Sequence, residues 1–375
     1  MALKGDLTTS ESAVKELRAL VDELDEINGR LEGIEFEMAE LKELIKKNGL
    51  DSEENAKAIS DLQRVKVSNY TQLQYEDTNQ SGKQQHSFEL RRIRTTFKIN
   101  VNEFADAKVS FDLAAGDEDT DAELKDAILT YKTGDSTKLV AGQFSNKMGY
   151  EIGRSSSKRE FPERAAYNKA VFGGERIRGA YLEHAAEGGA TFYAGLANGL
   201  SVGDKEETAV KGSGVAGRMA GFAGVRFDQD NGSSYGLSYW NGKRPSNNSG
   251  GPEVTRHFLY GDAYVPFEGG LYVRAEGMVG KDRTSLNSNA GAVDVNGWQI
   301  QLGLDMDDES SIFARYVEWD KDTDVDDNTQ KSYGLGYRYT LSKGAMITAT
   351  YEVFEDPTKS QSLWNAVTIR YQFKF

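Results

Sequence analysis

The chain contains no cysteine, only three histidines and only five prolines among its 375 residues. Without cysteine it has no disulfides and no thiolate chemistry. The histidines, His86, His184 and His257, stand far apart without metal-ligand spacing, and no nucleophile motif accompanies any of them. We therefore expect no metal site, no cofactor and no enzymatic activity.

Long hydrophobic runs are missing as well. No stretch approaches the roughly 18 apolar residues of a membrane-spanning helix, which excludes that class of protein. The mean hydropathy of −0.60 looks too polar for any membrane protein. A transmembrane β-barrel is nevertheless compatible with it, because half of each strand faces water. The chain is rich in the residues that such strands and their turns use, with 39 Gly, 18 Tyr and 17 Phe.

The opening decapeptide, MALKGDLTTS, lacks the basic and then apolar pattern of a secretory signal. Because an exported protein needs such a signal, we expect the sequence to be the mature form with an added or reassigned Met1.

Residues 1–64 are predicted to form a coiled coil followed by a short linker helix. Apolar residues recur every seven positions over residues 11–48, and Gly49 ends the helix. Leucine-type residues at one seam position and isoleucine at two of the others favour three or four strands over a parallel dimer. A single amphipathic helix lying on a domain is the less favoured interpretation, because the apolar stripe is narrow. The predicted trimerisation seam is Leu17, Leu20, Leu24, Ile27, Leu31, Ile34, Met38, Leu41 and Ile45.

From Val65 to Phe375 the period changes from seven to two. Apolar residues alternate with polar ones, as in Tyr333, Leu335 and Tyr337 between Gly334, Gly336 and Arg338. This alternation is typical of a transmembrane barrel. We predict an all-β barrel of sixteen antiparallel strands over 65–77, 87–101, 104–115, 122–133, 137–144, 175–186, 190–199, 214–228, 232–242, 253–266, 269–282, 292–305, 309–321, 330–341, 344–357 and 361–375.

Short and long connections alternate between these strands, as periplasmic turns and external loops do in outer-membrane barrels. An even strand number places both chain ends on the periplasmic side, and the coiled coil with them. The last strand alternates most clearly and ends in an aromatic residue. It resembles the assembly signal of outer-membrane barrels, carried here by Tyr371, Phe373 and Phe375.

The longest connection, residues 145–174, carries six basic and three acidic residues, a local charge of +3 in a chain of net charge −14. We expect it to fold into the barrel as a constriction loop that meets passing anions. Two less specific interpretations remain open, a solvated surface loop and arginines that pair with neighbouring carboxylates and only set the pore size. The predicted anion-contacting residues are Lys147, Arg154, Lys158, Arg159 and Arg164 on the loop and Arg92, Arg94, Arg176 and Arg178 on strands.

Three segments, LRRIRTTFKI, AELKDAILTYK and VAGQFSNKMGYEIGRSSSKREFPERA, resemble the phosphate-selective porin O and P family. In that family a Gly-Gln-Phe strand end, here Gly142-Gln143-Phe144, leads into the constriction loop. The loop runs to a Phe-x-Glu-Arg turn, here Phe161-Pro162-Glu163-Arg164. The resemblance covers residues 65–375, is best over 87–185, and implies a sixteen-stranded trimeric porin that passes small anions.

The sequence therefore predicts an outer-membrane porin for small solutes, with a preference for phosphate-like anions and a periplasmic coiled coil. The expected partners are outer-membrane lipid, two further copies in a homotrimer, small anionic solutes and a cell-wall component, and no nucleic acid. The alternative is a structural anchor whose coiled coil spaces or tethers the membrane to the cell wall.

Overall fold

The computed structural model describes residues 2–47, 64–83, 86–114, 122–172, 176–198, 219–245, 253–283 and 291–375. The chain divides into two compact units, Met1–Arg64 and Val65–Phe375.

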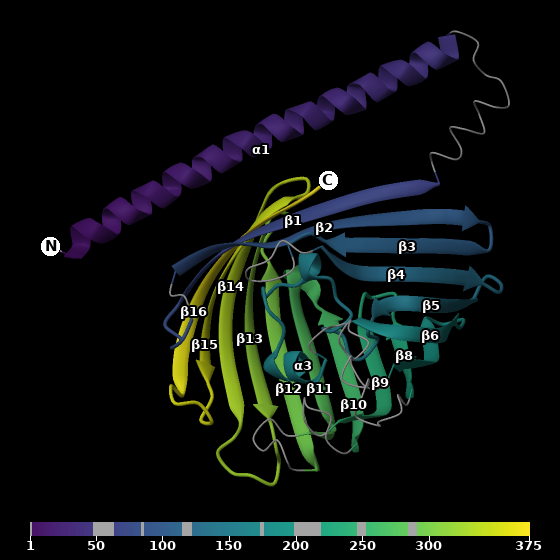
Figure 1. The fold of residues 1–375 in the computed structure, drawn as a ribbon, viewed down its shortest axis with the longest axis vertical. Helices are drawn as coiled ribbons and strands as arrows, with labels where there is room; N and C mark the ends of the chain where they lie inside the picture. The colour runs from purple at the N-terminus through teal and green to yellow at the C-terminus, as the bar shows by residue number, and fades with distance from the viewer. Residues whose placement is uncertain are drawn as a thin grey trace. The chain divides into compact units, whose positions relative to one another are not determined.

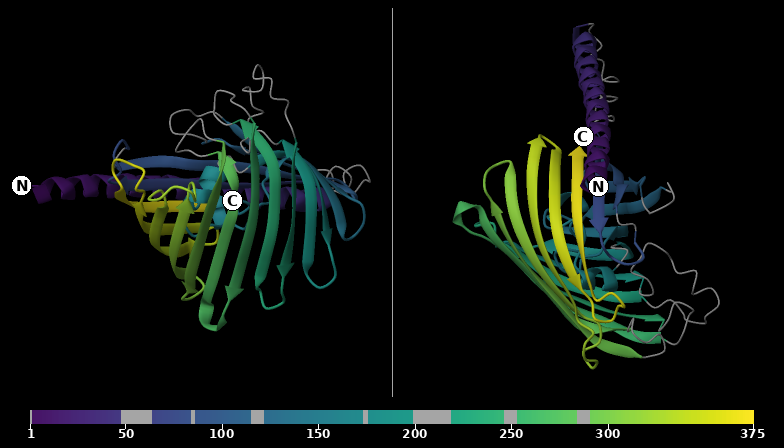
Figure 2. Two further views of the ribbon diagram at one scale, coloured as in Figure 1. Left: turned by 90° about the horizontal axis from the view of Figure 1, so that it is seen from below. Right: turned by 90° about the vertical axis from the view of Figure 1, so that its left-hand side faces the viewer.

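The second unit is a closed antiparallel barrel in which every strand pairs with its sequence neighbours and β1 closes the ring against β16 (Figure 1). Figure 2 shows the same strands as one continuous curved wall. The strands are β1 (Val65–Thr78), β2 (His86–Asn102), β3 (Ala105–Asp112), β4 (Glu123–Lys132), β5 (Thr137–Ser145), β6 (Arg176–Ala185), β7 (Ala190–Asn198), β8 (Met219–Asp228), β9 (Ser234–Pro245), β10 (Glu253–Pro266), β11 (Leu271–Arg283), β12 (Ala292–Asp305), β13 (Ser310–Asp320), β14 (Gln330–Ser342), β15 (Ala345–Glu355) and β16 (Leu363–Lys374).

The predicted sixteen-stranded barrel is confirmed, and most predicted boundaries agree with the observed ones to within a few residues. The strand predicted over 104–115 is shorter and ends at Asp112. The strand predicted over 214–228 begins among residues outside the description, and β8 is described from Met219.

Successive side chains along each strand of the wall point alternately to the outer and the inner face of the barrel. On β14, Leu335 is 62% exposed and Tyr337 43% exposed, whereas Ser332 is only 7% exposed. Apolar residues thus cover the outer face that meets lipid, and polar residues face the interior. The last strand follows the same rule, and its aromatic rings lie in a row, Tyr371 next to Phe373 and Phe373 next to Phe375. Their role as an assembly signal stays a prediction.

The first unit contains one long helix, α1 (Ala2–Lys47). Its seam residues Ile27, Ile34, Met38 and Leu41 are 44–57% exposed in the single chain. The side chains of Leu17, Leu20 and Ile45 lie outside the described residues. So does the linker helix predicted from Asp51 or Ser52 to about Arg64, apart from Arg64 itself. The described part of this unit thus contains a long helix with an exposed apolar stripe, and its assembly into a coiled coil stays a prediction. None of the described helices is long and apolar enough to cross a membrane.

The connection between β5 and β6 contains a 3-10 turn, η1 (Ser156–Lys158), and a short helix, α3 (Ala166–Val171). A second 3-10 turn, η2 (Glu268–Gly270), joins β10 to β11. Figure 1 shows α3 against the inner side of the wall, in front of β11 and β12. The segment from residue 145 to residue 172 is called the inner loop below.

One side of the inner loop packs into the hydrophobic core of the barrel. Its apolar residues Met148, Ile152, Tyr167, Val171 and Phe172 are at most 3% exposed. They cluster with inward aromatic residues of β5 to β10, namely Phe144, Tyr181, Phe222, Trp240, Phe258 and Tyr260. Burying each large apolar side chain stabilises the packed state by roughly 1.5–3 kcal/mol. The loop is therefore firmly attached to this part of the wall.

Candidate functional site: the inner loop and the facing wall

The tip of the inner loop contacts strands on the other side of the barrel interior. The side-chain amide of Gln372 on β16 donates to the Ser157 carbonyl at 3.2 Å, and that of Gln72 on β1 donates to the Ser156 carbonyl at 3.3 Å. Arg370 on β16 donates to the Pro162 carbonyl at 3.2 Å. The loop leaves β5 and returns to β6, so these contacts require that it cross the barrel interior.

Two of the predicted loop cations are neutralised by carboxylates. The Lys147 ammonium lies 3.0 Å from Glu183 Oε2 and over the ring of Tyr181. The Arg154 guanidinium lies 2.8 Å from Glu160 Oε1, and Arg274 of β11 binds the other oxygen of Glu160 at 2.9 Å. These two cations therefore act as internal braces.

Glu160 lies on the inner loop and not on a membrane-spanning strand. Burial by itself raises the pKa of the Glu160 carboxyl, but the positive charges of Arg154, Arg274 and Arg338 outweigh it and hold that pKa below its ordinary value of 4.5. Opposite charges within a few ångströms favour the ionised form of a carboxyl group. Glu160 is consequently an anion at neutral pH and holds the loop against β11.

Arg164 is also a structural residue. Its guanidinium donates to the carbonyl oxygens of Glu151 at 3.1 Å, Ile152 at 3.1 Å and Arg154 at 3.0 Å. These bonds fold the two limbs of the loop onto each other, and the side chain is buried. Arg164 shapes the loop that carries the remaining cations.

Lys158 and Arg159 are placed differently. Lys158 is exposed at the loop tip. Arg159 is only 6% exposed, and among the described residues none of its three guanidinium nitrogens has a hydrogen-bond partner. Its electrostatic neighbours are Glu163, Glu151, Arg91 and Arg315. A buried guanidinium without a hydrogen-bond acceptor is costly, so an acceptor that approached Arg159 would be bound favourably.

Arg92 and Arg94 face the same region from β2. Arg94 pairs with Asp112 at 2.7 Å, so its charge is largely compensated. Arg92 donates to the neutral side chain of Gln72 at 3.3 Å and lies 4.0 Å from Asp112. Arg92 therefore keeps much of its positive field, which also acts on Arg159.

A third arginine on β2 was missed by the sequence analysis. The pairing of β1 with β2 shifts at Gln72, which lies opposite Arg92, while Leu73 lies opposite Leu90. Arg91 is the extra residue of this bulge, and it reaches Glu163 on the inner loop at 3.1 Å. A bulge re-aims a side chain in this way. The signal in the sequence is the pair Arg91-Arg92, which breaks the alternation of the strand.

Arg370 of β16 was likewise missed in the site prediction. It lies 3.7 Å from Glu163 and its guanidinium also donates to Gln74. We call Arg91, Arg92, Arg159, Arg370 and Glu163 the tip cluster. Four guanidinium groups face one carboxylate there, and arginine forks match the geometry of phosphate and carboxylate groups.

Arg176 and Arg178 are not brought to the tip cluster. Arg176 pairs with Asp126 of β4 at 2.8 Å, and Arg178 donates to Gln143 of β5 at 2.8 Å. Ile177 between them packs into the core inside the barrel, so the alternation of β6 turns Arg178 to the face that carries Leu182.

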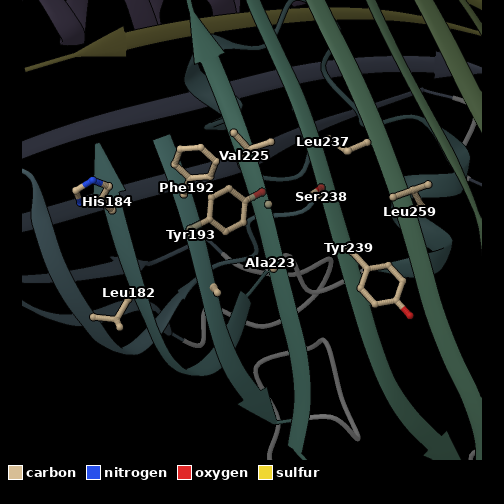
Figure 3. Close-up of a pocket in the computed structure, with 12 residues that line it drawn as sticks. Leu182, His184, Phe192, Tyr193, Ala223, Val225, Leu237, Ser238, Tyr239 and Leu259 are labelled. Carbon is tan, nitrogen blue, oxygen red and sulfur yellow. The ribbon is translucent and has the colours of Figure 1, made fainter. Parts of the chain in front are cut away.

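A separate apolar depression of about 560 Å³ lies over β6 to β10 (Figure 3). Most of its lining consists of exposed side chains of the outer wall, including Leu182, Phe192, Leu237, Tyr239 and Leu259. It faces lipid and does not belong to the path of a solute. Within the described residues, no group of three or more acidic or histidine side chains is arranged to hold a metal ion.

Comparisons with known proteins agree with this architecture. The family model of the phosphate-selective porin O and P matches residues 65–254. Among solved structures, the anion-selective porin from Comamonas acidovorans aligns with a TM-score of 0.65 at 13% identity, over 83% of this chain and 99% of that one. The outer-membrane channel DcaP of Acinetobacter baumannii aligns with a TM-score of 0.61 at 12% identity, over 83% and 97%.

The trimer form of OmpT from Vibrio cholerae aligns with a TM-score of 0.57 at 14% identity, over 83% of this chain and 99% of that one. At these identities the structural likenesses establish the fold alone. The comparison with curated sequences gives no match.

Proposed function

This chain belongs to the phosphate-selective porin O and P family, and from that premise we propose that its tip cluster makes the channel anion-preferring. The porin itself is a channel for the passive diffusion of solutes across the bacterial outer membrane. The proposal concerns which solutes pass most readily and which residues they meet.

The observation that carries the proposal is the buried guanidinium of Arg159, which has no hydrogen-bond partner within the part of the chain that the structure describes. Unit charges about 4 Å apart interact by roughly 4 kcal/mol at an effective dielectric constant of 20, so the neighbouring arginines repel one another strongly. Glu163 offsets part of this repulsion, and Lys169 binds the same carboxylate at 3.2 Å. A small anion beside Arg159 would remove the remaining cost, and rings of arginine and lysine set anion selectivity in pores.

The other cations of the loop are already bound by carboxylates or carbonyl oxygens, so the proposal concerns two residues of the loop. Lys147 and Arg154 are paired with carboxylates and Arg164 with carbonyl oxygens. Lys158 is exposed and Arg159 unpartnered among the described residues. We therefore assign the attraction of anions to Lys158 and Arg159, supported by Arg91, Arg92 and Arg370 from the wall. Phosphate-like oxyanions are the solutes that suit several guanidinium forks at once.

The test is the double substitution of Lys158 and Arg159 by Ala, measured by reversal potentials in a KCl gradient across a planar bilayer. We expect the native channel to prefer chloride over potassium and the preference to fall in the variant, together with any block of current by phosphate. The preference should also shrink at high salt, because the Debye length falls from about 10 Å at 0.1 M to about 3 Å at 1 M.

The matched control is Lys281→Ala, which removes one positive charge at the external end of β11, where Lys281 pairs with Asp294 at 3.0 Å. It should leave the reversal potential unchanged. Unaltered selectivity in the double variant, with earlier melting of the protein, would mean that the loop tip is a brace and not a filter. A barrel that is silent in the bilayer would favour the alternative of a membrane anchor.

We further propose that the protein is a homotrimer whose α1 helices form a periplasmic coiled coil. The supporting observation is the exposed stripe of Ile27, Ile34, Met38 and Leu41 along a helix of 46 residues. An apolar seam of this kind is buried when helices associate. One of the structural relatives, OmpT of Vibrio cholerae, is described as a trimer.

A further inference from the structure

A single carboxylate on the wall receives both limbs of the inner loop. Glu276 of β11 is only 3% exposed. Its Oε1 accepts hydrogen bonds from the Tyr167 hydroxyl at 2.7 Å and from the Asn168 side-chain amide at 2.7 Å. Its Oε2 accepts the backbone N–H of Glu151 at 2.9 Å and the backbone N–H of Tyr150. Residues near the start and near the end of the loop thus meet at one side chain.

The four donors match the number of acceptor positions on the two oxygens of Glu276. Two carboxylate oxygens offer about four lone-pair positions, and all four are used here. The loop therefore supplies one donor for each acceptor position of Glu276. A further hydrogen-bond donor could bind only if one of these four bonds were lost.

The backbone of the loop is shaped to approach this carboxylate closely. Gly149 adopts a positive φ of 60°, which glycine takes without strain. A Cβ atom at this position would lie 2.6 Å from Glu276 Oε2 and 2.8 Å from the ring of Tyr260. Only a glycine can bring the following two N–H groups into place.

Asn168 joins the carboxylate to the rest of the site. Its amide nitrogen also donates to Glu151 Oε2 at 2.8 Å, and its amide oxygen accepts from the Tyr260 hydroxyl at 3.2 Å. Glu151 in turn receives Arg315 of β13 at 3.3 Å. The contact at Glu276 is thus the centre of a network that includes the loop and β10, β11 and β13.

We propose that Glu276 is a positioning residue that fixes the path of the inner loop across the barrel and thereby gives the channel one well-defined conductance. Other wall residues that hold the loop, such as Arg370 and Gln372, contact one stretch near its tip, at Pro162 and Glu163 for Arg370 and at Ser157 for Gln372. Glu276 instead ties together two segments that are sixteen to eighteen residues apart in sequence. The proposal rests on the barrel being a channel and not on which ions it prefers.

The experiment is Glu276→Gln in the full chain, recorded as single channels in symmetrical KCl. The amide keeps the size of the side chain but directs an NH₂ group at two donors, so two of the four bonds are lost. We expect the single conductance level of the native channel to split into several levels with increased open-channel noise. Native conductance and noise in Glu276→Gln would overturn the proposal.

Two further variants keep the test decisive if Glu276→Gln does not fold. Tyr167→Phe removes one donor and keeps the ring, so it should give a smaller increase in noise; a native trace from it would likewise overturn the proposal. The matched control is Asp262→Asn on β10, whose carboxylate pairs with Arg226 of the wall at 2.8 Å. It should leave the conductance unsplit, and equal noise from this control would show general damage to the wall and refute a specific role for Glu276.

The two proposals fail separately. Loss of selectivity in the Lys158 and Arg159 double variant, with an undivided conductance, leaves the role of Glu276 standing. A split conductance in Glu276→Gln with the native preference for anions supports the role of Glu276. It does not bear on the assignment of anion attraction to Lys158 and Arg159, which the double variant tests.

Discussion

Phe172 is the residue whose removal most directly tests how the inner loop is held. It follows α3, is only 1% exposed, and meets Trp240 and Phe258 edge to face with ring centroids 5.6 and 5.4 Å apart. The Arg256 guanidinium lies 5.0 Å from the centre of its ring. Phe172→Ala therefore removes apolar burial, two aromatic contacts and a cation–π contact at once.

The expected cost follows from these contacts. Truncating a buried Phe to Ala costs about 3–5 kcal/mol in protein cores. The strands form a closed ring of backbone hydrogen bonds that does not include Phe172, so most of this cost falls on the attachment of the loop. Since every 1.4 kcal/mol is a factor of ten, the population of detached loop should rise about 10²- to 10³-fold.

Amide hydrogen exchange of residues 150–172 in detergent measures this population directly, because local opening exposes the loop amides without unfolding the barrel. Exchange in the loop should accelerate while the strands stay protected and the barrel keeps its melting temperature. The matched control is Phe192→Ala, which removes a ring that is 49% exposed on the outer wall and should leave loop exchange unchanged.

Two results would refute the reasoning. If the loop amides exchange at the native rate in Phe172→Ala, the aromatic cluster does not hold the loop. If the barrel melts together with the loop, the two form one cooperative unit, and the loop is not an element docked on a finished wall.

Two further predictions follow from the helix and from Glu160. A peptide of residues 8–50 should be trimeric by analytical ultracentrifugation, because the seam disfavours a parallel dimer; a clean dimer would exclude the trimeric interpretation. Glu160 has a pKa below its ordinary value of 4.5, so its contribution to loop attachment is fully present above that pH and is lost as the pH falls through the lowered value. The intrinsic pH dependence of exchange is removed by comparison with Glu160→Gln at the same pH. The loop amides of the native protein should lose protection as the pH falls below 4.5 and through the lowered pKa, and those of Glu160→Gln should not.

The wall of the barrel could be predicted from the sequence because each strand residue has only two environments. One face meets lipid and the other meets the interior, so alternation records the strand directly, as at Leu335 against Ser332. Strand ends were predicted less well where apolar residues follow the last paired residue, as Leu113 and Ala114 follow Asp112.

The site could be predicted only in part. The charge excess of the inner loop is visible in the sequence, and Lys158 and Arg159, to which we assign the attraction of anions, were among the candidates. Which cations are compensated depends on partners far away in the chain, such as Glu183 for Lys147. The bulge at Arg91 and the role of Glu276 depend on register and loop path, which composition and period do not contain.

The free-energy cost on one side of the inner loop is offset by stabilising contacts on its other side. The loop carries a buried cation, Arg159, that has no hydrogen-bond partner among the described residues. Such a group destabilises the loop by several kcal/mol unless other contacts offset the cost. The offset is found on the other side of the same loop, in the burial of Phe172 and in the four bonds to Glu276. Functional sites are commonly maintained in this way, with strain at one point and excess stabilisation at another. On our proposal an anion passing the tip cluster relieves the cost only transiently, so the anchors must hold the loop without it. Weakening Phe172 or Glu276 should therefore disturb the channel most when no binding anion such as phosphate is present.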